Sequence, residues 1–287
     1  MADSDTTCLN CDAQLGGEYC ADCGQRRTDR NPTFREFIAE TFRELLDWDG
    51  KIPATIRALL ARPGLLTEDF LAGRRARWIS PLRVYLICSV TYFIANPLVA
   101  RIAGRSADRP TAVSFVTDAG ERVSLSDLTA EERDAIARSP IFSRLGAGRL
   151  ERIEANSDAI GEIIVEAIPK AMFVLMPLFA LLTWSLWRSG GARYPAHLYF
   201  ALHLHAALFA SLVLPRVTAA LGREALTAGL GLIAVIYSTW YTGAAMKRVL
   251  GGTAGQLIGR GLVLGVVYSV AMLAVVLGIA VVAILQA

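Results

Sequence analysis

The sequence predicts an all-α integral membrane protein with about five transmembrane helices, and three observations support this prediction. Hydrophobic residues make up 54% of the 287 residues and charged residues only 19%, which is too apolar for an ordinary water-soluble domain. Five segments are close to the roughly 20 apolar residues that cross about 30 Å of hydrocarbon. The first residues are polar and acidic and lack the pattern of a signal peptide. We therefore expect the amino terminus to stay in the cytosol.

Cysteines are concentrated at the beginning of the chain. Two Cys-x-x-Cys pairs place four thiolates where they can surround one ion tetrahedrally. Asp12 and Gly24 directly follow the two pairs, at a position where such turns need a residue that tolerates positive φ. A reducing cytosol keeps thiols free for metal, so two disulfides are the weaker interpretation. A thioredoxin-type redox motif would need a strand-helix pattern around the cysteines, which residues 8–23 lack. We expect residues 1–28 to form a cytosolic zinc ribbon that binds one structural Zn²⁺ through Cys8, Cys11, Cys20 and Cys23.

Residues 29–80 are predicted to form cytosolic juxtamembrane helices. Thr33 and Glu36 make a capping box, and apolar residues recur every three or four positions as far as Leu46. This pattern predicts an amphipathic helix that either packs on its neighbours or lies on the bilayer surface. A second helix is expected over 53–62, and Thr67 is expected to cap a third that runs to residue 73.

The apolar segments define the spans, and they leave one sizeable insertion. Residues 81–102 are expected to hold transmembrane helix 1, and residues 168–287 to hold helices 2–5. Residues 103–167 are predicted to form a small extracytoplasmic α+β insertion, with a hairpin of 112–116 and 122–125 and a helix capped by Thr129. The expected apolar cores are Leu82–Ile102, Ile168–Trp187, His197–Pro215, Ala228–Met246 and Leu262–Leu285.

The charges of the short loops predict the orientation of the spans. Arg188 and Arg193 lie between spans two and three, and Lys247, Arg248 and Arg260 lie between spans four and five, with no carboxylate in either loop. Loops with excess positive charge stay in the cytosol. This rule agrees with a cytosolic ribbon, and five spans then place the carboxyl terminus outside the cytoplasm.

All three histidines of the chain, His197, His203 and His205, lie in or beside the third span. An ionisable group at bilayer depth indicates a candidate polar site. His203 and His205 are about 200° apart around the helix, so this helix alone cannot chelate one ion. A metal site would need soft ligands such as Cys88, Met172 or Met176 from other spans. Hydrogen bonds to hydroxyl groups of span four, between residues 237 and 242, are the favoured alternative.

The sequence lacks the usual marks of several functional classes. None of the five spans contains Asp or Glu, which argues against a cation-coupled transporter that uses membrane-buried acids. The chain contains neither H-E-x-x-H nor G-x-S-x-G, and we expect no enzyme. A nucleic-acid partner is not expected either, because the ribbon has few basic residues and the net charge is +3.

Five motifs together resemble a bacterial zinc-ribbon membrane protein family of unknown function, domain of unknown function 3667. They are the Cys-x-x-Cys pair followed by Tyr19-Cys-Ala-Asp-Cys-Gly-Gln25, Arg57-x-Leu-Leu-x-x-Pro-Gly64, Gly73-Arg-Arg-x-Arg77, Pro81-x-x-x-Tyr85, and Tyr194-Pro-x-His197 with Phe200-Ala-Leu-His203-x-His205. The resemblance covers most of the chain except residues 103–167. It implies a zinc ribbon on a bundle of about five helices in the bacterial inner membrane, and it implies no activity or catalytic residue.

These observations lead to two functional hypotheses. In the first, the protein is a docking, scaffold or sensing protein that the bilayer anchors and that binds a membrane or cytosolic protein partner through its ribbon. In the second, it is a permease or channel for a small solute, a metal or protons, with a pathway lined by His203 and His205. Self-association through the spans is compatible with both hypotheses.

Overall fold

The computed structural model describes residues 7–27, 35, 50–104, 114–116, 122–124, 129, 131, 157–188 and 191–286. The chain divides into two compact units. One comprises Met1–Arg105 and Val174–Tyr268, and the other comprises Ser106–Phe173 and Ser269–Ala287. The first unit contains the cysteine pairs, the three histidines and most of the long helices.

Within the described residues, five helices are long and apolar enough to cross a membrane, which confirms a multi-pass membrane protein. The third begins three residues earlier than the expected apolar core, because Pro195 fits the first turn of a helix. The second begins well before its spanning part, Pro169–Leu186, so the expected boundary at residues 167 and 168 falls inside a helix. The five helices are α4 (Pro81–Ile102), α7 (Ser157–Leu186), α8 (Tyr194–Ala220), α9 (Glu224–Val249) and α10 (Ala254–Gln286).

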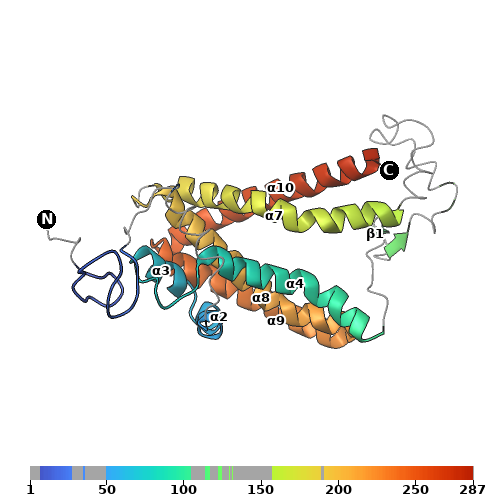
Figure 1. Cartoon of the computed structure of the whole chain (residues 1–287). Coiled ribbons are helices and arrows are strands. Elements are labelled where there is room, and N and C mark those ends of the chain that lie inside the picture. Colours follow the sequence, from blue (N-terminus) through green and yellow to red (C-terminus); the bar gives the residue numbers. More distant parts are fainter. Residues whose placement is uncertain are drawn as a thin grey trace. The chain divides into compact units, whose positions relative to one another are not determined.

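Helix α8 is at the centre of the first unit, and α4 and α9 pack along it (Figure 1). Every residue of α8 from Pro195 to Ala207 is buried. Aromatic rings fill the contact between α4 and α8, where Tyr92 and Phe93 lie 5.2 and 5.5 Å from the ring of Phe209. Aromatic side chains bury large areas at low conformational cost, so they fix the relative position of the two helices.

Two short helices precede α4 and pack against α8, and the second of them also packs against α9. These are α2 (Ile52–Ala61) and α3 (Leu65–Leu71), which confirm two predicted helices. The expected cap of α3 is wrong: Gly64 occupies the N-cap with φ 76°, and Thr67 lies fully buried inside the helix. The predicted amphipathic helix between residues 33 and 47 lies outside the described residues, apart from Arg35.

A two-stranded antiparallel sheet lies in the second unit. Strand β1 (Ser114–Val116) pairs with β2 (Arg122–Ser124), and Phe115 faces Val123 in the register. This pairing confirms the predicted hairpin. The helices expected after the hairpin lie outside the described residues, of which only Thr129 and Glu131 fall in that region.

Candidate metal centre and its contact with the membrane-spanning helices

The two Cys-x-x-Cys segments fold into equivalent turns. The N–H of Asp12 donates to the carbonyl of Cys8 at 2.9 Å, and the N–H of Gly24 donates to the carbonyl of Cys20 at 3.0 Å. Asp12 and Gly24 adopt φ values of 61° and 72°, as their positions after the second cysteines predict. Asp12 is the one residue other than glycine with positive φ among the described residues. The backbone therefore aims both thiols of each pair toward the opposite turn.

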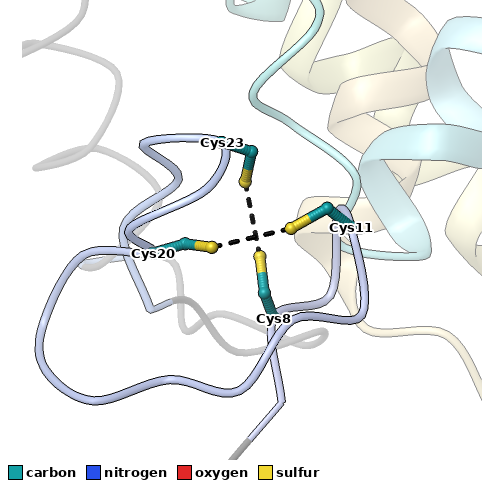
Figure 2. A group of neighbouring side chains, drawn as sticks. All are labelled: Cys8, Cys11, Cys20 and Cys23. Atoms are coloured by element: carbon teal, nitrogen blue, oxygen red, sulfur yellow. Dashed lines mark hydrogen bonds between the residues drawn. The ribbon is translucent and has the colours of Figure 1, made fainter.

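The four thiols of the two turns meet at one point (Figure 2). Their sulfur atoms all lie within 4.8 Å of one another, and the Sγ atoms of Cys8 and Cys23 are 3.5 Å apart, as are those of Cys11 and Cys20. A disulfide would need about 2.05 Å. A tetrahedral ion with metal–sulfur bonds of about 2.3 Å requires sulfurs roughly 3.8 Å apart. The geometry fits one metal ion held by four cysteines.

The thiols influence one another electrostatically. Burial opposes ionisation of Cys23, but hydrogen bonds from the N–H of Gln25 and from the thiols of Cys11 and Cys8 outweigh it and lower the pKa of Cys23 to about 7. The backbone at Ala13 favours the thiolate of Cys11, yet its cysteine neighbours raise the pKa of Cys11 to about 12. Ionisation of one thiol therefore opposes ionisation of its neighbours, unless a bound cation offsets the negative charges. Such a donor set suits a bound cation.

The ribbon, defined here as residues 7–27, is joined to the segment after α3 by one glutamine. Gln25 lies two residues after the last cysteine, and its side chain is 7% exposed. Its Nε2 donates to the carbonyl of Gly73 at 2.7 Å, and its Oε1 accepts from the N–H groups of Arg75 and Ala76, both at 2.9 Å. One side chain thus satisfies three backbone groups of residues 73–76, which we call the docking turn.

The other half of the ribbon contacts the same docking turn. Leu9, between the first two cysteines, packs directly on Gly73. A Cβ atom built on Gly73 would lie 2.5 Å from Cδ1 of Leu9, and the φ of +83° at Gly73 already disfavours any other residue. Glycine is therefore required at this position for two independent reasons.

Asp69 ties the docking turn to α3. Its carboxylate is 4% exposed and accepts from Nε and Nη2 of Arg74 at 3.0 and 2.6 Å and from Nε1 of Trp78 at 2.7 Å. The N–H of Arg74 also donates to the carbonyl of Asp69 at 2.8 Å. A buried carboxylate with several donors gives a rigid connection, because moving any donor would leave a buried charge undersatisfied.

Helix α3 in turn contacts the face of α8 that carries His203. The hydroxyl of Thr67 lies 3.0 Å from Nδ1 of His203, and both groups are buried. The ring of Phe70 packs at 5.6 Å against the rings of His203 and Tyr199. The guanidinium of Arg75 lies over the ring of Tyr199 at 5.7 Å.

The other two histidines lie elsewhere on α8. Nε2 of His205 is 3.0 Å from the hydroxyl of Tyr268 on α10, and its ring packs on Phe179 at 5.0 Å. His197 is 2% exposed, and neither ring nitrogen has a hydrogen-bond partner among the described residues. The hydrogen-bond partners that the sequence suggested for these histidines, on span four, are not the ones observed for His203 and His205. Among the described residues, metal-ligating side chains gather in a group of three or more only at the four cysteines.

The turn between α2 and α3 is fixed to the end of α9 through carbonyl oxygens. The hydroxyls of Tyr237 and Tyr241 donate to the carbonyls of Leu60 and Leu59 at 2.7 and 2.8 Å, and Nη1 of Arg248 donates to the carbonyl of Pro63 at 2.6 Å. The last carbonyls of a helix lack partners within the helix. Helix α9 supplies these partners, so it caps α2 from outside.

The observations so far describe a multi-pass helical membrane protein with a cluster of four cysteines near its beginning that could hold one metal ion. Residues 49–93 match the family model described as protein of unknown function (DUF3667), so this segment is a domain of unknown function. The match covers α2, α3, the docking turn and the first part of α4, and it includes neither the cysteine pairs nor the histidine motif. The family match therefore covers fewer residues than the resemblance that the sequence motifs indicate. No curated protein and no solved structure matches the chain.

Proposed function

We propose that this protein is a non-enzymatic docking, scaffold or sensing protein of the bacterial inner membrane, with a cytosolic ribbon that binds one structural Zn²⁺. The observation that supports this most directly is the convergence of four cysteine sulfurs within 4.8 Å of one another. Four thiolates in tetrahedral geometry favour Zn²⁺ among the common biological divalent ions. A bound Zn²⁺ would supply folding free energy to the ribbon rather than chemistry.

The arrangement of the first unit supports a cytosolic ribbon. Helix α3 contacts the beginning of α8 at Tyr199 and the end of α9 at Arg248, so these helix ends lie together on the ribbon's side. The basic residues predicted to face the cytosol, including Arg193 and Lys247, belong to these ends. The positive-inside rule then orients the ribbon toward the cytosol and the carboxyl terminus toward the outside.

Metal analysis of the purified full-length protein tests the zinc site. We expect one Zn²⁺ per chain, lost in Cys11→Ser and in Cys20→Ser, because removing one thiolate from a four-ligand site destroys its geometry. Cys88→Ser is the matched control, since Cys88 is the fifth cysteine and lies in α4 away from the site. A wild-type protein without bound metal, or an equal loss in the control, would contradict the proposal.

The docking role needs a separate test. Chemical cross-linking in intact cells should capture partners of the wild-type protein and of Cys88→Ser, and these partners should be lost in Cys11→Ser and Cys20→Ser. If the partners are unchanged after complete loss of zinc, the ribbon is not the docking element. Labelling of the ribbon thiols from outside intact cells would overturn the proposed orientation.

A permease or channel is the second candidate, and one observation favours it. His197 is buried near the beginning of α8, a helix long and apolar enough to cross a membrane, and no described residue bonds to either of its ring nitrogens, which marks a candidate functional group. Against this, His203 and His205 lie in packed helix contacts. An open surface pocket of about 540 Å³, lined by residues that include Ser238, Thr242 and Gly261, has none of the three histidines in its lining. Solute or proton flux in proteoliposomes that is lost in His197→Ala would favour the permease.

A further inference from the structure

Both halves of the ribbon contact the docking turn, and this contact depends on how the halves are held together. Leu9 belongs to the first Cys-x-x-Cys turn, and Gln25 follows the second. Both reach Gly73, one by packing and the other by a hydrogen bond of 2.7 Å. The docking turn therefore recognises the two halves in one fixed relative position.

The ribbon has little besides its cysteines to fix that position. It comprises 21 residues (7–27), and its buried members are Cys8, Cys20 and Gln25, with Gln25 used for docking. A module this small cannot form a hydrophobic core of its own, so a bound ion provides most of its folding free energy. The backbone of Gln25 also belongs to the second turn, because its carbonyl accepts from the N–H of Cys20 at 2.9 Å.

The contacts continue without interruption from the docking turn into the bundle. Asp69 holds Arg74 of the docking turn, and Asp69 itself lies in α3. Two residues earlier, the hydroxyl of Thr67 meets Nδ1 of His203. Each of these groups is buried or partly buried, so displacement of the docking turn would expose polar groups that now bond to one another.

We infer that the metal-bound ribbon acts as a clamp that holds the docking turn and α3 against α8, so that metal occupancy at the cysteines controls the environment of His203 inside the bundle. This inference rests on the proposed function and specifies what a sensing head would transmit. Loss of the ion separates Leu9 from Gln25, releases the docking turn, and frees Thr67 from His203. The face of α8 that carries His203 is then open to a partner or to water.

Modification of histidine by diethyl pyrocarbonate, read by mass spectrometry on the full-length protein in nanodiscs, tests the clamp. Removing the metal with a chelator should speed modification of His203 by about tenfold or more, since a buried group reacts through local opening. His205 serves as an internal control because it bonds to Tyr268 and not to α3. Amide hydrogen exchange over residues 65–76 should accelerate in parallel.

Two variants separate the clamp from the metal site itself. Gln25→Ala keeps all four thiolates, so it should retain one Zn²⁺ per chain and yet make His203 as reactive as chelation does. Gln14→Ala is the matched control, because Gln14 is an exposed glutamine of the same ribbon. Gly73→Ala should act like Gln25→Ala, while Gly104→Ala, which has a similar φ of +66° but no neighbour within 4 Å, should not.

The outcomes distinguish the clamp from the wider proposal. If the wild-type protein binds Zn²⁺ but chelation leaves the modification of His203 and the exchange of α3 unchanged, the clamp is wrong and the docking role stands. If the wild-type protein binds no metal, both the clamp and the proposed zinc-dependent docking role are wrong. If Gln25→Ala binds metal normally and His203 stays protected, the clamp is also wrong.

Discussion

Helices α8 and α9 are neighbours of similar length, yet they differ sharply in what surrounds them. Of the most apolar stretch of α8, 56% is buried, compared with 11% for α9. The more buried helix holds all three histidines, whereas α9 exposes Leu232, Ile233 and Ile236. In a bilayer, apolar side chains gain little by leaving lipid for protein, so polar groups and close packing decide which helix is central.

The buried part of α9 is small and has a specific position. Tyr241, Ala245 and Met246 are buried near its end, where the turn between α2 and α3 rests on it. The rest of α9 mostly faces outward. The first half of α8 is enclosed by several partners, whereas α9 packs along α8 on one side, holds the turn between α2 and α3 near its end, and leaves its outer face exposed.

The largest expected effect tests whether α8 is the true core. Phe200 is 1% exposed and packs against Phe179 at 6.4 Å. Phe200→Ala should lower the free energy of unfolding by about 3–5 kcal/mol, through lost contacts and the cavity left behind. Leu232→Ala on the outer face of α9 should cost less than about 0.5 kcal/mol. Unfolding of both variants by SDS titration measures the difference, and equal costs would refute the contrast between the helices.

A smaller effect should appear where α9 is held at its end. The Cβ of Ala at position 64 would lie 3.1 Å from Cγ2 of Val249 and 3.2 Å from Cα of Ala245, at a φ of +76°. Gly64→Ala should destabilise by about 2–3 kcal/mol from strain and overpacking together. Gly104→Ala carries the strain without the contact and should cost about 1 kcal/mol. If the two variants unfold alike in SDS, the end of α9 is not tightly packed.

The smallest effect concerns one hydrogen bond at the same contact. Tyr241→Phe removes the donor to the carbonyl of Leu59 and should cost about 1 kcal/mol. Thr239→Val is its control, because that hydroxyl is exposed and bonds within its own helix to the carbonyl of Val235. Thermal unfolding in detergent should separate the two variants. A cost no greater for Tyr241→Phe than for Thr239→Val would mean that the tyrosine ring alone makes the contact.

Much of the fold follows from local sequence patterns. The five apolar runs predicted the five long helices, including the one that contains Asn96 and Pro97, because hydrocarbon thickness sets the required length. The two Cys-x-x-Cys pairs predicted the convergence of four thiols and the positive φ at Asp12 and Gly24. Spacing along the chain determines such features, so no knowledge of tertiary neighbours was needed.

The contacts between distant elements did not follow from the sequence. Helical geometry correctly separated His203 from His205, but the expected partners on span four were not those observed. Thr67 was expected to cap a helix, since its hydroxyl offers no sign that it faces a histidine 136 residues away. Gln25 ends one of the motifs that carry the family resemblance, but the sequence assigns it no contact, because a glutamine beside a cysteine pair looks like any polar surface residue. Which helices become neighbours depends on packing of the whole bundle.

The anchoring of α2 through its carbonyl oxygens has a consequence for mutational tolerance. Every amino acid carries the same carbonyl, so Leu60 and Pro63 can change identity without losing the acceptors used by Tyr237 and Arg248. The selective constraint of this contact falls on the donors of α9 alone. In a deep mutational scan, substitutions that remove a donor at positions 237, 241 and 248 should be depleted, while polar and apolar replacements at position 60 should be accepted more readily.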